Sequence, residues 1–408
     1  MANRYNRRLA LPIRPMNAPL HDLIALPIGP DILRGAIDIE TTTRGLLPHR
    51  LPAWARAQYP DPQLAMAESQ PSGVRLVLRT TATLLELDTL PTRHVYAGVP
   101  PRPLGMYDLL VDGERVAQTT AIGGDVVTID MRAGTVTKQE GPVATLRFEG
   151  LPPRDKRVEI WLPYHEITEV VALRGNAPAH PVADDGRRVW LHHGSSISHG
   201  SNGASPTTIW TALAAAAGGV DLLNLGFSGS ALLDPFVART MRDTPADVLS
   251  VKIGINLVNA DLMRMRAFVP AVHGFLDTLR DGHPETPLLI VSPIYCPIHE
   301  TTPGPGAFDV EALAEGKVMF LATGNPADSA AGKLTLETIR RELARIVEQR
   351  AKHDPHLHYL DGRELYGPAD HETLPLPDRL HPDAETHRLM AERFAAKVFA
   401  ESGPFTPL

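Results

Sequence analysis

The stretch VWLHHGSSISHG, residues 189–200, decides how the second half of this 408-residue chain folds. It begins with the apolar run Val189–Leu191 and breaks at Gly194, which predicts a buried strand that ends in a tight turn. Turns of this kind are where α/β folds place their functional side chains. Because Ser195 and Ser196 follow Gly194 directly, the turn presents two candidate functional serines.

The chain divides into two halves with different residue patterns. Between residues 31 and 175, short alternating runs such as GVRLVLRTTATLLEL and VATLRFEGL are separated by turn residues, which predicts antiparallel strands and hairpins. From Val189 onward, apolar strands alternate with helical stretches, which predicts a parallel sheet covered on both faces. We therefore expect an N-terminal arm (residues 1–30), a β-sandwich domain (31–175), a linker (176–188) and an α/β domain (189–408).

One irregular segment interrupts the second half. The sequence HETTPGPGAFDVEALAEG, residues 299–316, follows the strand that is predicted to end near Tyr295. Long irregular segments in compact domains are often functional, so we expect this one to form part of a lid or of a pocket wall.

Composition and charge exclude several classes of partner. The formal net charge is −7, and no run of Lys or Arg is interleaved with aromatic residues, so nucleic acid is not an expected partner. The single cysteine, Cys296, allows neither an intrachain disulfide nor a cysteine metal cluster. No apolar segment approaches the ~18 residues of a membrane span, and the basic opening MANRYNRRLALPIRP has no apolar stretch of signal-peptide length. We expect a cytoplasmic protein with no membrane partner, and the oligomeric state stays open.

Four polar segments of the second half lie, in order, where predicted strands end: GSSIS (194–198), NLGFSGS (224–230), GIN (254–256) and DRLHPD (378–383). A serine nucleophile needs a base for its proton, a carboxylate to orient that base, and donors for the oxyanion that forms on attack. The spacing of Asp378 and His381 lets the carboxylate fold back to accept a hydrogen bond from Nδ1 of the imidazole. Nε2 is then free to face Ser196.

These segments, in this order, resemble the blocks of the SGNH or GDSL hydrolase superfamily, which supply Ser, Gly, Asn and His. The resemblance covers roughly residues 185–400. It implies a catalytic triad of Ser196, His381 and Asp378. It also implies an oxyanion hole that consists of the Ser196 N–H, the Gly229 N–H and the Asn256 side-chain amide.

Two positions depart from the family pattern. Ser195 stands where the family usually has aspartate, and Leu257 follows Asn256 where a second aspartate is common. Each change removes a polar group close to the site, but neither removes a catalytic role. The resemblance implies a flavodoxin-like three-layer α/β/α hydrolase domain, and the preceding β-sandwich (jelly-roll-like) is similar to the arrangement in some carbohydrate esterases of this superfamily.

The activity implied by the resemblance is that of a serine esterase without a metal or another cofactor. Its substrate would be a small-molecule ester of a small acyl group, with acetyl esters of a sugar or of another hydroxylated metabolite as the first candidates. An acyltransferase would use the same triad, because the two reactions differ only in the acceptor that reaches the acyl-enzyme. A carbohydrate-binding protein with an inactive hydrolase domain is the third interpretation, and the presence of Ser196, Asp378 and His381 argues against it.

Three more histidines, His192, His193 and His199, lie close to the predicted turn. No Asp or Glu lies at ligand spacing beside them, and successive strand residues face opposite sides, so we expect no metal site here. His199 follows the candidate nucleophile by three residues. We therefore expect His199, together with Ser195, to line the substrate pocket.

Overall fold

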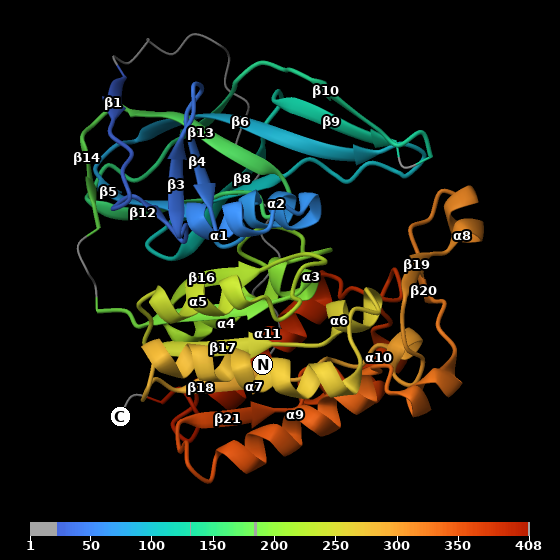
Figure 1. Cartoon of the computed structure of the whole chain (residues 1–408). Helices are drawn as coiled ribbons and strands as arrows, with labels where there is room; N and C mark the ends of the chain where they lie inside the picture. Colours follow the sequence, from blue (N-terminus) through green and yellow to red (C-terminus); the bar gives the residue numbers. More distant parts are fainter. Residues whose placement is uncertain (1–22, 131, 183–185, 407–408) are drawn as a thin grey trace.

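The computed structural model describes residues 23–130, 132–182 and 186–406. Residues 1–22 of the predicted N-terminal arm and residues 183–185 of the predicted linker lie outside the described residues. The described chain forms a mainly β half that lies against an α/β half (Figure 1).

Two sheets make up the N-terminal half. The first runs in the order β10–β9–β6–β13–β4–β3, with β1 beside β13 and β11 beside β6. Its described strands are β1 (Ile24–Leu26), β3 (Asp38–Thr41), β4 (Leu46–His49), β6 (Leu84–Tyr96), β9 (Asp125–Asp130), β10 (Thr135–Gln139), β11 (Ala144–Glu149) and β13 (Ile167–Gly175). The second runs in the order β14–β5–β12–β7–β8, with β2 beside β5. Its described strands are β2 (Leu33–Arg34), β5 (Arg75–Thr80), β7 (Met106–Val111), β8 (Glu114–Thr120), β12 (Lys156–Trp161) and β14 (Ala179–Pro181).

Both sheets contribute to one apolar core, which makes this half a sandwich. In β11 the side chains of Leu146 and Phe148 are buried and those between them are exposed, which is the period of two expected for a strand with one face on a core. Leu76 of β5 and Ile160 of β12 enter the same core from the other sheet. Alternation along the sequence therefore identified this half correctly.

The sandwich extends beyond the predicted range of 31–175. Strand β1 lies inside the predicted N-terminal arm and pairs with β13 of the sandwich. Strand β14 lies inside the predicted linker and pairs with β5 of the sandwich. Two short helices, α1 (Ala53–Gln58) and α2 (Pro62–Ser69), are inserted between β4 and β5. Helix α2 begins with proline at its first position after Asp61, whose carboxylate accepts a hydrogen bond from Leu64 N–H at 2.8 Å.

The C-terminal half contains a parallel sheet in the order β16–β15–β17–β18–β21. Its strands are β15 (Val189–Gly194), β16 (Asp221–Gly226), β17 (Val248–Lys252), β18 (Leu288–Val291) and β21 (Leu357–Leu360). Counted along this half, the order is 2-1-3-4-5, which is the flavodoxin-like order. The predicted fold class is therefore confirmed.

Helices cover both faces of this sheet. The first crossover moves outward from β15 to β16, and the later crossovers run back across the sheet, so right-handed connections place their helices on opposite faces. One face carries α4 (Trp210–Gly218) and α11 (Ala384–Val398), which pack together. The other carries α5 (Pro235–Asp243), α7 (Met265–Gly282) and α9 (Leu336–Arg350). None of the helices in the described part of the chain is long and apolar enough to cross a membrane.

The two halves meet along β12, which is buried over its whole length. Val158 and Ile160 point into the sandwich core, whereas Trp161 packs with the core of the α/β half. The guanidinium of Arg75 stacks over the ring of Trp161, 4.8 Å from its centroid, and donates to Asp221 Oδ1 of β16 at 3.1 Å. Side chains of the sandwich therefore reach the sheet that carries the candidate site.

Candidate active site

The candidate nucleophile lies at the turn between β15 and the short helix α3 (Ser196–His199). Two glycines, Gly194 and Gly226, allow the start of α3 to pack closely against the ends of β15 and β16. A Cβ on Gly194 would collide with the side chain of Ser198, and a Cβ on Gly226 of β16 would collide with the backbone of His199. Ser196 therefore lies at the carboxyl end of β15, an interior strand of the sheet, with only 8% of its surface exposed.

The structure brings Ser196, His381 and Asp378 into one hydrogen-bonded chain. Ser196 Oγ lies 2.9 Å from His381 Nε2, and His381 Nδ1 lies 2.7 Å from Asp378 Oδ2. Oδ1 of Asp378 accepts from the backbone N–H groups of Leu380 at 2.9 Å and of His381 at 2.6 Å. The carboxylate is thus held by the backbone of the same loop, and it orients the imidazole toward the serine.

The fourth polar segment does not lie at a strand end. Asp378 and His381 belong to the loop between α10 (Pro368–Thr373) and α11. The cap of α11 is Asp383, which accepts from Thr386 N–H at 2.9 Å, so Asp378 is free of a capping role for this helix. A loop of this kind can fold over the sheet edge and bring His381 to a serine 185 residues away.

The three candidate oxyanion donors come from the ends of the neighbouring strands β16, β15 and β17. Gly229 follows β16, and Asn256 lies in α6 (Ile255–Asn259), which follows β17. Asn256 Oδ1 accepts from Ala231 N–H at 3.1 Å, so the amide nitrogen of Asn256 points the other way. Neither this nitrogen nor the N–H of Gly229 or of Ser196 has a hydrogen-bond acceptor among the described residues. The order of the strands reverses here, which is where open α/β sheets bind ligands.

Leu257 follows Asn256 but points into the core. Its side chain is fully buried in the core of the α/β half, and Asn256 is held by its contact with Ala231 instead. The departure from the family pattern is therefore compatible with an oriented asparagine.

The carboxyl of Asp378 has a pKa below its ordinary value. Burial alone raises this pKa, but the hydrogen bond and charge of His381 and the two backbone N–H groups outweigh that effect. Asn202 adds a hydrogen bond from Nδ2 to Asp378 Oδ2 at 3.2 Å. The carboxylate is therefore ionised at neutral pH, as a group that must stabilise an imidazolium has to be.

A cavity of about 400 Å³ opens beside Asp378 and His381, between the two halves. Its lining residues are His94, Val95, Tyr96, Val99, Pro100, Pro101, Arg102, Asn202, Phe308, Val318, Phe320, Pro377, Asp378 and His381. Phe308 and Phe320 belong to the irregular segment and its continuation, where β19 (Gly306–Phe308) pairs with β20 (Phe320–Ala322). The ring of Phe320 meets His381 edge-on, with centroids 5.5 Å apart. The segment thus forms a pocket wall, facing the end of β6 (Figure 1).

His199 and Ser195 are not among the residues that line this cavity, and both are almost fully buried. His199 is buried between the halves, where its Nε2 lies 2.5 Å from Tyr164 O and its Nδ1 lies 3.2 Å from a guanidinium nitrogen of Arg50. Burial and the charge of Arg50 hold the pKa of His199 well below its ordinary value. Ser195 is the buried N-cap of α3, and its Oγ accepts from Ile197 N–H. The contacts of both residues are with buried backbone and side-chain groups of the protein.

His192 and His193 are also buried in polar contacts of the core. His192 lies between Ser250 Oγ at 2.7 Å and Ser198 Oγ at 2.8 Å, and burial holds its pKa well below the ordinary value. His193 contacts Leu225 O at 2.8 Å, and burial lowers its pKa to about 4. Across the described ranges, no group of three or more His, Cys, Asp or Glu side chains is arranged to hold a metal ion.

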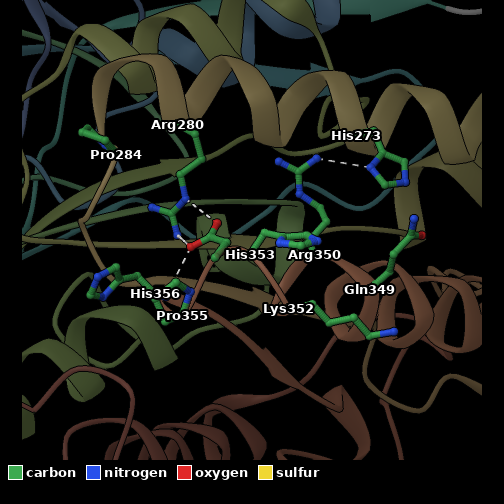
Figure 2. A pocket seen from close by; sticks show the side chains of 10 residues that line it. His273, Arg280, Pro284, Gln349, Arg350, Lys352, His353, Pro355 and His356 are labelled. Carbon is green, nitrogen blue, oxygen red and sulfur yellow. Dashed lines mark hydrogen bonds and ion pairs between the residues drawn. The ribbon is translucent and has the colours of Figure 1, made fainter.

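A second hollow, of about 610 Å³, lies beside the residues that precede β21, at the amino ends of the strands (Figure 2). Two of the cations that line it have partners: Arg280 pairs with Asp354 at 2.7 Å, and Arg350 lies beside His273 (Figure 2), 3.2 Å from its Nδ1. No serine lines this hollow, and Ser196 lies at the other, carboxyl end of the strands. It is therefore a separate surface feature.

Comparison with known proteins gives two kinds of match. Residues 188–299 match the GDSL-like Lipase/Acylhydrolase family. No match to the chain was found among curated proteins. Among solved structures, the salicylyl-acyltransferase SsfX3 from a tetracycline biosynthetic pathway is 29% identical, with a TM-score of 0.72 over 92% of this chain and 96% of that one.

Two more distant structures share the fold. A protein described as a GDSL-like lipase, from Bacteroides ovatus, is 18% identical, with a TM-score of 0.62 over 89% of this chain and 93% of that one. A family two carbohydrate esterase from Clostridium thermocellum is 16% identical, with a TM-score of 0.51 over 80% of this chain and 91% of that one. Since these matches cover most of each chain, both halves of the architecture recur together.

Proposed function

We propose that this chain cleaves esters of small acyl groups through an acyl-enzyme on Ser196. The premise is that residues 188–299 belong to the GDSL-like lipase/acylhydrolase family and that the chain is a carboxylic ester hydrolase. One observation carries this proposal. Ser196 Oγ, the imidazole of His381 and the carboxylate of Asp378 form a continuous chain with links of 2.9 and 2.7 Å. This is the arrangement that makes a serine hydroxyl nucleophilic.

Acylation begins when Ser196 Oγ attacks the ester carbonyl carbon and His381 Nε2 takes the hydroxyl proton. The carbonyl oxygen gains the negative charge, and the N–H groups of Ser196 and Gly229 and the Asn256 amide donate to it. His381 then gives its proton to the departing alkoxide, which leaves as an alcohol. Asp378 keeps Nδ1 protonated throughout, so that Nε2 is the nitrogen that exchanges protons with the substrate.

Deacylation repeats these steps with water. His381 takes a proton from a water molecule, whose oxygen attacks the acyl carbon, and the same donors stabilise the second oxyanion. The proton then returns to Ser196 Oγ, and the carboxylic acid leaves. No step requires a metal ion, because the imidazole supplies the base and the three donors stabilise the charge.

For the alcohol part of the substrate, we propose the cavity between the halves, since it opens beside His381, the residue that must protonate the leaving oxygen. An acetyl ester of a sugar or of another hydroxylated metabolite is the first substrate class. The cavity wall carries Phe308, Phe320 and Tyr96, which offer flat apolar surfaces on which a ring can stack.

Acyl transfer is the second candidate function. Two observations favour it: the 29% identity to a salicylyl-acyltransferase over 92% of this chain, and a cavity of about 400 Å³ that could hold a bulky acceptor alcohol in place of water. The acyl-enzyme would be the same, and the acceptor hydroxyl would give its proton to His381. The two functions therefore differ at the second step alone.

Labelling of Ser196 tests the shared chemistry, and product analysis separates the two functions. A fluorophosphonate probe should label the wild-type protein and leave Ser196→Ala unlabelled. With p-nitrophenyl esters of increasing chain length, hydrolysis predicts that the released p-nitrophenol equals the free acid formed, fastest for acetyl. A shortfall of acid, matched by a new ester when an alcohol is added, would favour transfer. An unlabelled but folded wild-type protein would contradict both.

A further inference from the structure

A residue of the N-terminal half touches the turn that carries Gly229. Gln63, the second residue of α2, donates a hydrogen bond from Nε2 to Ser228 O at 2.8 Å. Its side chain also covers the α-carbon of Gly229, since a Cβ built there would lie 3.2 Å from Gln63 Nε2. The two residues in hydrogen-bond contact are 165 positions apart in the chain.

The backbone of this turn has two available forms. Ser230 N–H donates to Phe227 O at 3.1 Å, which closes a four-residue turn, and Gly229 has a φ of +73°. A positive φ at the third residue, with none at the second residue Ser228, is characteristic of a type II turn. Types I and II differ mainly by a rotation of roughly 150–170° of the central peptide, which here joins Ser228 to Gly229. Because glycine adopts either sign of φ readily, Gly229 does not by itself hold this peptide in one orientation.

The orientation of the central peptide decides where the Gly229 N–H points. In a trans peptide the C=O and the N–H point in opposite directions. Gln63 holds Ser228 O on the side of α2, so the Gly229 N–H points away from α2. In the rotated form the Ser228 carbonyl oxygen would take the place of that N–H and would repel an oxyanion.

Helix α2, which carries the exposed Gln63, is fixed relative to the turn. The fully buried guanidinium of Arg50 donates to Ala67 O of α2 and also to Asn224 O at 2.9 Å and Gly226 O at 2.6 Å, at the end of β16. Helix α2 and strand β16 therefore share one buried cation.

We propose that Gln63 is a positioning residue that holds the Ser228–Gly229 peptide in the orientation that an oxyanion hole requires. Gln63, a residue of the N-terminal half, thereby completes the site of the α/β half without itself touching the substrate. The inference rests on the proposed function, because it assumes that the Gly229 N–H stabilises the oxyanion.

Three variants test this role. Gln63→Met keeps the length and packing of the side chain but removes the donor, and Gln63→Glu places carboxylate oxygens against Ser228 O. Gln58→Ala is the matched control, because Gln58 of α1 hydrogen bonds Arg239 of α5 across the same boundary but does not contact the turn. The measurements are kcat and KM on p-nitrophenyl acetate, the rate of fluorophosphonate labelling of Ser196, and the melting temperature.

We expect Gln63→Met to lower kcat roughly tenfold and to leave KM within about twofold, because the Gly229 N–H is then misoriented for part of the time. This loss is smaller than the ~10²- to 10³-fold seen when an oxyanion donor is deleted. The labelling rate should fall in parallel, because the phosphoryl oxygen uses the same hole. Gln63→Glu should be slower still, and its activity relative to wild type should recover as pH falls through the ordinary glutamate range near ~4.3, where a protonated carboxyl donates again. Gln58→Ala should match wild type.

Two results would overturn the inference: Gln63→Met with wild-type kcat and labelling rate, or Gln58→Ala with an equal loss, which would indicate general loosening between the halves. A fall in melting temperature with unchanged kcat would likewise assign Gln63 a structural role only. If the wild-type protein is not labelled at Ser196 at all, the proposed function itself fails, so the two failures are distinguishable.

Discussion

Asn202 donates a hydrogen bond from Nδ2 to Oδ2 of Asp378 over 3.2 Å, and the same oxygen lies 2.7 Å from His381 Nδ1. Against the effect of burial, the hydrogen bond and charge of His381 and two backbone N–H groups hold the pKa of the partly buried Asp378 carboxyl below its ordinary value. A lowered carboxyl pKa stabilises the folded protein above the ordinary range, and that contribution is lost as pH falls through the folded value. The Asp378 carboxyl is therefore ionised at neutral pH.

The first prediction concerns Asp378→Asn. An asparagine can donate toward Nδ1 of His381, which would favour the tautomer with its proton on Nε2, facing Ser196. We expect kcat to fall by up to roughly 10⁴-fold, as for the same change in other serine triads, and the melting temperature at pH 7 to fall modestly, because the charge that stabilises the folded protein is lost. The matched control is Asn202→Ala, which removes one hydrogen bond from Asp378 and should cost less than about tenfold. Equal effects of the two variants would contradict an orienting role for Asp378.

A second prediction separates the two adjacent serines. Ser196→Ala should fold and lose nearly all turnover, because the remaining site lacks a nucleophile. Ser195→Ala should keep both turnover and fluorophosphonate labelling, since Ser195 Oγ caps α3 and lines no part of the cavity. Its cost should appear as a lower melting temperature, of the size of a lost helix cap, about 1 kcal/mol. Labelling of Ser196→Ala with retained activity would make Ser195 the nucleophile.

The alternation of strands and helices and the position of the turn with the candidate nucleophile could be predicted from local sequence, because each depends on short patterns, whereas the flavodoxin-like strand order was implied by the family resemblance. The run VWLHHG ends at a glycine, and strands alternate with helices thereafter. Helix α2 also has a local signal, since Asp61 followed by Pro62 is a helix start. The sequence offered that signal, but a short helix inside a strand-rich half was not expected.

Contacts between the halves could not be predicted in this way. Gln63 and Arg50 look like ordinary surface residues in their local sequence, and their partners in the α/β half lie more than a hundred positions away. His199 shows the opposite case, where closeness in sequence to Ser196 suggested the pocket. One helical turn carries its side chain to Tyr164 and Arg50 instead.

A third prediction uses Asp234, at the start of α5. Burial, with a contribution from the charge of Asp61, raises the pKa of Asp234 to about 6. Between its ordinary value and 6 the folded protein holds a proton that the unfolded chain has released, so stability from this group is present at low pH and is lost as pH rises through about 6.

Asp234→Asn should therefore raise the melting temperature relative to wild type at pH 7.5, and the difference should shrink or vanish at pH 4.5. Thermal unfolding of both proteins at the two pH values measures this. A difference that is independent of pH would contradict a raised pKa of Asp234 in the folded protein.

The last prediction concerns Asn256, whose Oδ1 accepts from Ala231 N–H while its Nδ2 has no acceptor among the described residues. The substrate carbonyl oxygen gains a full charge only in the tetrahedral intermediate, so a preorganised amide donor stabilises that state far more than the bound ester. Asn256→Ala should therefore lower kcat by roughly 10²- to 10³-fold, about 2.7–4 kcal/mol, with KM little changed. Asn256→Asp keeps the acceptor for Ala231 but removes the donor and adds a charge that repels the oxyanion, so it should be at least as slow. If either variant kept kcat and raised only KM, Asn256 would bind the ground state, and the hole would consist of the Ser196 and Gly229 N–H groups.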